Sequence, residues 1–177
     1  MKNNGTILTN PDLNPFHIVL VEPEIPPNTG NISRLCVGTG SVLHLVGKLG
    51  FEISDRTLKR AGLDHWPHLN LKRHADWVSF KSAHDRARLL YFSKHGETPY
   101  TRTEYRPGDF LVFGSETKGL PREILEENKD SMFFIPTTGL VRSLNLSNAC
   151  AVVLYEAIRQ VDILMPSSLK NIASRID

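Results

Sequence analysis

Apolar runs of strand length alternate along the chain with segments whose apolar residues recur at helical spacing. Nearly continuous apolar runs are typical of parallel strands buried on both faces of a sheet. They predict strands at residues 16–22, 42–46, 89–92, 110–113 and 132–135. The helical spacing predicts helices at residues 28–38, 54–63, 76–86, 121–128 and 146–163. Strands that alternate with helices predict an α/β fold with a mainly parallel sheet flanked by helices.

Proline and capping residues set the expected boundaries of these elements. Pro23, Pro26 and Pro27 predict a loop after the first strand, with Asn28 or Thr29 capping the helix that follows. Pro121 suits the first turn of its helix. The polar residues 93–109 are expected to form a long connection.

The last predicted helix carries apolar residues on more than one side. Its main stripe is broad, and Val152 and Leu154 fall outside it. In a domain of this size, a second apolar side indicates a second buried contact, and the simplest such contact is a homodimer interface.

Length and composition describe one soluble domain. The 177 residues suit a single core, expected at residues 16–165, with a flexible leader at 1–15 and a tail at 166–177. Two cysteines, Cys36 and Cys150, lie in apolar stretches and are interpreted as buried thiols. No apolar run reaches the length of a membrane span and no targeting segment is evident, so a cytoplasmic protein is expected. A net charge of +2 permits a nucleic-acid partner without requiring one.

Three polar segments follow predicted strands, where parallel α/β sheets place their ligands. They are residues 28–34 (NTGNISR), 113–121 (FGSETKGLP) and 135–148 (IPTTGLVRSLNLSN). Turns and helix caps could account for each segment alone. One helix start, however, uses only one or two caps, and the third segment offers Ser143, Asn145, Ser147 and Asn148. Together the segments predict a binding site in which glycines let the backbone approach a flat ligand.

Several common chemistries lack their motifs. The chain has no G-x-G-x-x-G after a strand, no phosphate-binding P-loop and no G-x-S-x-G nucleophile turn. Of the seven histidines, only His65 and His68 lie close in sequence, and Pro67 disrupts the helix that would align them. No metal cofactor is therefore expected.

Basic residues near aromatic residues suit single-stranded RNA through phosphate pairing and base stacking. One such group is Arg56, Lys59 and Arg60, followed by Trp66. A solvated helix face explains this group equally well, so the basic residues alone leave RNA binding open.

The three polar segments resemble, in order and spacing, the motifs of the SPOUT (trefoil-knot) RNA methyltransferases. Two further stretches, HIVLVEPEIPPNTGN and LKRAGLDHW, are similar to the minimal-length tRNA wobble-nucleotide 2′-O-methyltransferases. The resemblance covers about residues 16–161. It implies a C-terminal trefoil knot, which connection rules would not suggest, and an obligate homodimer. It also implies a pocket for S-adenosyl-L-methionine, with S-adenosyl-L-homocysteine as product and no metal.

The resemblance also implies roles for individual residues. The donor would be bound by Phe92, Gly114, Ile135, Ser143, Leu144 and Asn148. Arg34, Ser143, Asn145 and Glu116 would form the catalytic centre. RNA would be bound by Arg34, Lys59, Arg60, Arg142 and Tyr155.

The implied reaction is methylation of the ribose of the wobble nucleotide, cytidine or a modified uridine, in the tRNA anticodon loop. A guanidinium is a poor general base because it is almost always protonated, so Arg34 is expected to hold a phosphate and stabilise the developing alkoxide. A ribosomal RNA 2′-O-methyltransferase and a non-catalytic RNA-binding module are the alternatives.

Overall fold

A seven-stranded sheet forms the centre of the molecule. The computed structural model describes residues 15–51 and 65–161. The strands are β1 (His17–Val21), β2 (Val42–Val46), β3 (Leu71–His74), β4 (Leu89–Phe92), β5 (Thr98–Pro99), β6 (Phe110–Phe113) and β7 (Met132–Phe134). They lie in the order β3-β2-β1-β6-β4-β7-β5, and all six neighbouring pairs are parallel. The predicted α/β class is therefore confirmed.

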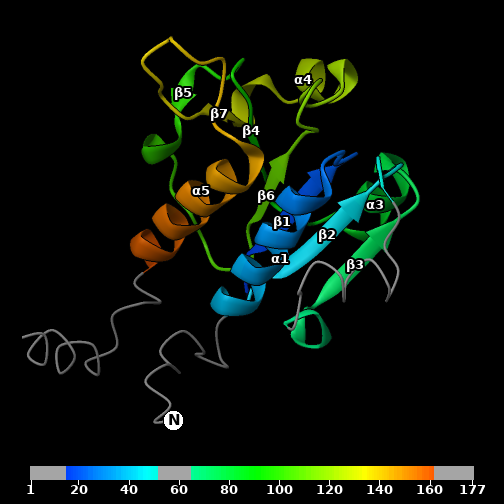
Figure 1. Ribbon diagram of the computed structural model, residues 1–177. Coiled ribbons are helices and arrows are strands. Elements are labelled where there is room, and N and C mark those ends of the chain that lie inside the picture. Colours follow the sequence, from blue (N-terminus) through cyan, green and yellow to red (C-terminus); the bar gives the residue numbers. More distant parts are fainter. Residues whose placement is uncertain (1–14, 52–64, 162–177) are drawn as a thin grey trace, which may run out of the picture.

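Helices cover both faces of this sheet (Figure 1). They are α1 (Pro26–Thr39), α3 (Trp77–Ala83), α4 (Arg122–Glu127) and α5 (Leu146–Val161). Helices α1 and α5 lie side by side on one face, where they share a core with the sheet. Helices α3 and α4 contribute Phe80 and Ile124 to a second core on the other face. The helix predicted at residues 54–63 lies outside the described residues.

The start of α1 differs from the sequence prediction. The helix begins at Pro26, with Ile25 as its N-cap, so Asn28 and Thr29 lie inside the first turn instead of capping it. Pro26 and Pro27 begin the helix because the first helical positions need no backbone N–H and proline already has the helical φ. Asn28 and Thr29 are both buried, which leaves Asn28 able to take part in the polar network described below.

Strands β3 and β5 were not predicted. β3 has the sequence LKRH and lies at the edge of the sheet, where its middle residues are exposed. β5 is only two residues long and lies within the expected connection at residues 93–109. Both strands form because they pair with an existing strand edge, and edge strands need no continuous apolar run.

Helix α5 packs more deeply than its pattern indicated. Leu154, expected on a second apolar side, is fully buried within the chain. Val152 and Tyr155 remain exposed by 36% and 48%. The two cysteines are buried in the core shared with α1, as predicted. Among the described residues, no helix has both the length and the apolar character that crossing a membrane requires.

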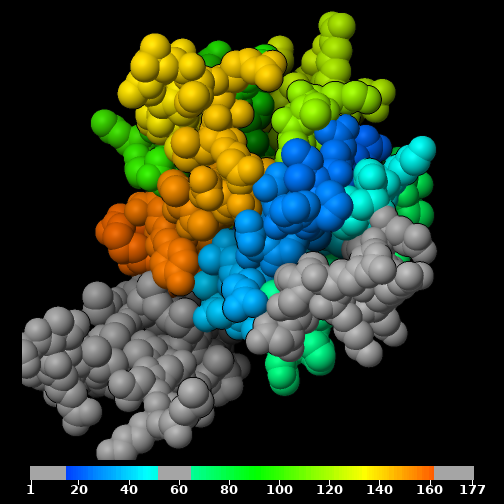
Figure 2. All heavy atoms as spheres, in the orientation of Figure 1, coloured from blue at the N-terminus to red at the C-terminus, as the bar shows by residue number. Residues whose placement is uncertain are grey.

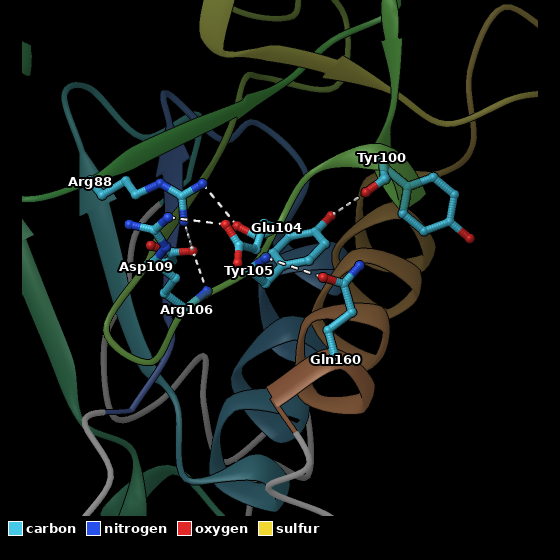
Figure 3. Close-up of polar contacts among 7 residues, drawn as sticks. All are labelled: Arg88, Tyr100, Glu104, Tyr105, Arg106, Asp109 and Gln160. Carbon is cyan, nitrogen blue, oxygen red and sulfur yellow. Dashed lines mark hydrogen bonds and ion pairs between the residues drawn. The ribbon is translucent and has the colours of Figure 1, made fainter.

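A polar network holds the connection between β4 and β6 against the rest of the domain (Figure 3). The buried carboxylate of Asp109 accepts hydrogen bonds from Arg88 Nη1 at 2.9 Å and from the backbone N–H of Arg106 at 2.7 Å. Burial raises the pKa of Asp109, and these donors oppose the rise. The backbone N–H of Tyr105 donates to Gln160 Oε1 of α5 at 3.2 Å. The connection is thereby attached to both the sheet and α5.

Candidate active site

A pocket of about 380 Å³ lies at the carboxyl ends of β4, β6 and β7, beside the start of α5. Its walls are the loops after these strands, which include residues 93–95, 114–120 and 142–145. In Figure 2 the yellow loop after β7 and the yellow-green loop after β6 flank a recess. The pocket therefore lies where the parallel topology places ligands, and two of the three polar segments predicted from the sequence supply most of its lining.

Glu116 connects the loop after β6 to the start of α1. Its carboxylate accepts the backbone N–H of Glu24 at 2.7 Å, the backbone N–H of Ile25 at 3.2 Å and the Asn28 side-chain amide at 2.9 Å. Two of these donors precede the first turn of α1, where the helix dipole favours a negative charge. Glu116 is thus positioned by three donors.

Asn28 continues the network to the third segment. Its Oδ1 accepts a hydrogen bond from Asn145 Nδ2 at 2.9 Å. Asn145 in turn caps α5, because its Oδ1 accepts the backbone N–H of Ser147 at 2.9 Å and the Ser147 hydroxyl at 2.7 Å. Side chains separated by 88 and 117 positions along the chain thereby form one continuous network.

Gly114 permits the tight folding of the loop after β6. A Cβ atom at this position would lie 2.0 Å from the carbonyl carbon of Gly119 and 2.1 Å from the amide nitrogen of Leu120. The backbones of Ser115 and Gly119 also exchange hydrogen bonds of 3.1 and 2.9 Å. Only glycine fits here, because every larger residue would overlap backbone atoms that have no room to move.

The structure brings most of the predicted site residues together. The pocket is lined by Phe92, Gly114, Glu116, Ile135, Arg142, Ser143, Leu144 and Asn145. Three predicted residues do not line it: Arg34 is exposed on α1, and Asn148 and Tyr155 are exposed on α5. Lys59 and Arg60 lie outside the described residues.

Sequence reasoning missed several lining residues. Lys94, His95 and Lys118 are exposed and line the same pocket, which gives it a basic rim together with Arg142. Lys94 and His95 directly follow β4, so their position after a predicted strand was the available signal. Asn28 was treated as a cap, although its motif correctly located it near the site.

The chain is similar in sequence to known proteins. Residues 15–155 match the model of the SpoU rRNA Methylase family. A tRNA (cytidine(34)-2'-O)-methyltransferase of Saccharophagus degradans is 49% identical over 147 residues, which cover 82% of this chain and 96% of that protein.

Two solved structures are also similar. One is described as giving structural insights into the 2-OH methylation of C/U34 on tRNA. It is 45% identical, has a TM-score of 0.78, and the match covers 83% of this chain and 96% of that one. The other is an AdoMet-bound rRNA methyltransferase from Sinorhizobium meliloti, with 26% identity, a TM-score of 0.73, and coverage of 85% and 58%.

Proposed function

Because the chain belongs to the SpoU rRNA Methylase family, we propose that it methylates the ribose 2′-oxygen of the tRNA wobble nucleotide with S-adenosyl-L-methionine as donor. Two relatives that match nearly end to end are described by methylation at position 34 of tRNA. The observation that supports this function in the structure is the pocket into which the loops after β4, β6 and β7 all converge. The basic rim of that pocket suits a polyanionic substrate.

The pocket fits the donor in size and in chemistry. Its volume of about 380 Å³ lies within the usual range for small-molecule sites. Backbone groups at Phe92, Gly114, Ile135 and Leu144 would hold the adenosine and methionine parts, and Ser143 adds a hydroxyl. Glu116 places a negative charge in a pocket whose proposed ligand is a sulfonium cation. When bound, the donor supplies an electrophilic methyl group, so the reaction needs no metal.

The chain's own residues would then orient the acceptor. Arg142 and Lys118, at the rim, are placed to pair with RNA phosphates next to the target nucleotide. Arg34 is exposed on α1, outside the pocket, and we assign it the binding of a phosphate and the stabilisation of the alkoxide as the 2′-oxygen loses its proton. Glu116 and Asn145 act as positioning residues because their hydrogen bonds fix the two loops relative to α1.

The proposal includes a homodimer, a trefoil knot and a cytoplasmic location. The exposed side chains of Val152 and Tyr155 on α5, together with Leu140 and Val141 in the loop before it, support a contact with a second copy. Such a contact would cover Tyr155 and bring the exposed Arg34 of α1 near the interface. Asn148, on the first turn of α5, would belong to the same contact surface between the two copies.

The first experiment measures methyl transfer with labelled donor and two acceptors, bulk tRNA and ribosomal RNA. After digestion to nucleosides, we expect a 2′-O-methylated nucleoside from tRNA. Product from ribosomal RNA alone would support the ribosomal alternative. Donor binding without product from either RNA would support a non-catalytic RNA-binding module.

Variants then test the assigned roles. Arg34→Ala should abolish turnover while donor affinity stays unchanged, because Arg34 lies outside the pocket. Arg122→Ala is the matched control, since Arg122 is an exposed arginine on α4 that pairs with Glu126. An unchanged rate in Arg34→Ala would remove Arg34 from the catalytic centre.

A further inference from the structure

A cluster of histidines lies away from the pocket, on the sheet face that packs against α3. His17, His44 and His74 come from the adjacent strands β1, β2 and β3, and His84 caps the end of α3. The nitrogens His17 Nδ1 and His44 Nε2 are 2.8 Å apart, and His44 Nδ1 and His74 Nε2 are 3.0 Å apart. None of these residues enters the proposed methyl transfer.

Three of the rings converge on one point. One nitrogen each from His44, His74 and His84 lies within 4.8 Å of the other two. In a tetrahedral zinc site, Zn–N bonds of 2.0–2.1 Å place ligand nitrogens about 3.3 Å apart. The His44–His74 pair already meets this spacing. His84 holds a ring nitrogen within 4.8 Å of this pair, and its ring makes no hydrogen bond to any of the described residues.

We propose that His44, His74 and His84 form a binding site for a divalent transition-metal ion of the zinc class, with water in the fourth position. His74 and His84 are half-buried, so the fourth position can face solvent. Because the ligands come from β2, β3 and the end of α3, the ion would fasten the edge strand and the helix to the sheet. The site is structural and separate from the methyl-donor pocket, and it revises the expectation that the chain binds no metal.

The contacts of His44 are compatible with the tautomer that such a site needs. If His44 Nε2–H donates to His17 Nδ1, the lone pair of His44 Nδ1 points toward His74 and the cluster centre. Metal-bound histidines usually donate their other N–H to a neighbouring acceptor in this way. His17 therefore acts as the outer partner of the site, and it is held in place by stacking on Phe110 with ring centroids 3.9 Å apart.

The charge state of the rings fits metal binding at neutral pH. Burial lowers the pKa of His44 to about 3 and that of His17 to about 4, and it also lowers the pKa values of His74 and His84. Neutral imidazoles offer lone pairs, whereas imidazolium ions do not.

The donor set also selects the class of metal. All donors are imidazole nitrogens, which bind zinc, copper and nickel, whereas magnesium and calcium prefer oxygen ligands. The cation Lys72 also acts on His44, but it repels every metal cation alike, so the selection comes from the imidazole donors.

Metal-free protein titrated with Zn²⁺ in a calorimeter should bind one ion per chain, and Co²⁺ should give the visible absorption bands of a tetrahedral site. His84→Ala should weaken Zn²⁺ binding at least 100-fold, because it removes a direct ligand, and should abolish the bands. His17→Phe should weaken binding about 10-fold, the lower end of the loss expected for an outer partner. His68→Ala is the matched control, since His68 is an exposed histidine in the short 3-10 helix η1 (Trp66–His68), outside the cluster.

Circular dichroism checks that each variant folds. If His84→Ala does not fold, His74→Gln serves as the ligand variant in its place. Zn²⁺ should also raise the Tm of the native chain and leave that of the folded ligand variant unchanged. Wild-type protein without one-to-one binding, or a folded ligand variant that binds like wild type, would overturn the site.

Discussion

The donor pocket and the histidine cluster are two polar centres built on one sheet in different ways. The pocket gathers whole loops after β4, β6 and β7, and a charged carboxylate at Glu116 is stabilised there by three donors. The cluster gathers single side chains from β1, β2, β3 and α3, and its rings are kept neutral by burial. An exposed ligand site can keep its charges because water and backbone N–H groups solvate them. A histidine cluster packed among aromatic rings stays neutral, because a buried charge without a partner is costly.

The largest expected effect comes from the pocket side of this comparison. Gly114→Ala would place a methyl group against the backbone of residues 119 and 120, at 2.0 and 2.1 Å. Backbone cannot yield as a flexible side chain does, so we expect a loss of about 3 kcal/mol in the free energy of unfolding. Urea unfolding measures the loss, and donor binding by calorimetry should fall with it. A variant with wild-type stability and affinity would show that the loop after β6 is more adaptable than its geometry indicates.

The next largest effect is a pH dependence of stability, which we expect from the histidine cluster and not from the pocket. The histidine pKa values are lower in the folded chain than the unfolded value of 6.5. As pH falls, the unfolded chain therefore takes up protons before the folded chain does. The contribution of these histidines to stability is complete above about pH 7 and is lost as pH falls toward 4. His44 alone should account for about 2 kcal/mol between pH 7 and 5. Metal-free protein unfolded by urea across this range gives the slope.

A variant assigns that slope to the cluster. His17→Phe removes one titrating ring and should flatten the decline, whereas His68→Ala should leave it unchanged because His68 lies outside the cluster. An equal slope in all three proteins would place the pH dependence elsewhere in the chain.

A smaller effect tests the network beside the pocket. Asn145→Ala removes the cap of α5 and the hydrogen bond to Asn28, and it should cost about 1–2 kcal/mol of unfolding free energy. Because the same contacts position the pocket loop, the KM for the donor should rise as well. Ser147→Ala, which keeps the Asn145–Asn28 bond, is the control and should leave KM nearly unchanged. A stability loss without a change in KM would assign Asn145 to capping only.

The smallest effect has the opposite sign. Gly38 lies in α1, and a Cβ at this position would meet nothing within 4 Å. Gly38→Ala should therefore raise the free energy of unfolding by about 0.5–1 kcal/mol, since alanine loses less backbone entropy in a helix. Set against Gly114→Ala in the same urea assay, this variant shows that the cost at Gly114 comes from its surroundings and not from the residue type. A loss of stability in Gly38→Ala would contradict this reading.

The amino-acid sequence by itself determined the strands with continuous apolar runs, the alternation of strands and helices, and the motifs that indicate the family. These signals are local, and each depends on residues that are neighbours in the chain. Most of the pocket residues could be predicted for the same reason, because parallel strands deliver the loops that follow them to one edge of the sheet.

Tertiary structure decided the rest. It extended the sheet with β3, whose LKRH sequence has no strand pattern of its own and forms a strand by pairing with β2. It placed Arg34 on an exposed side of α1, outside the pocket that its motif helps to build. It also brought His44 to His17 and His74, which lie 27 and 30 positions away in the chain. Strand register sets such contacts, and register depends on the whole sheet.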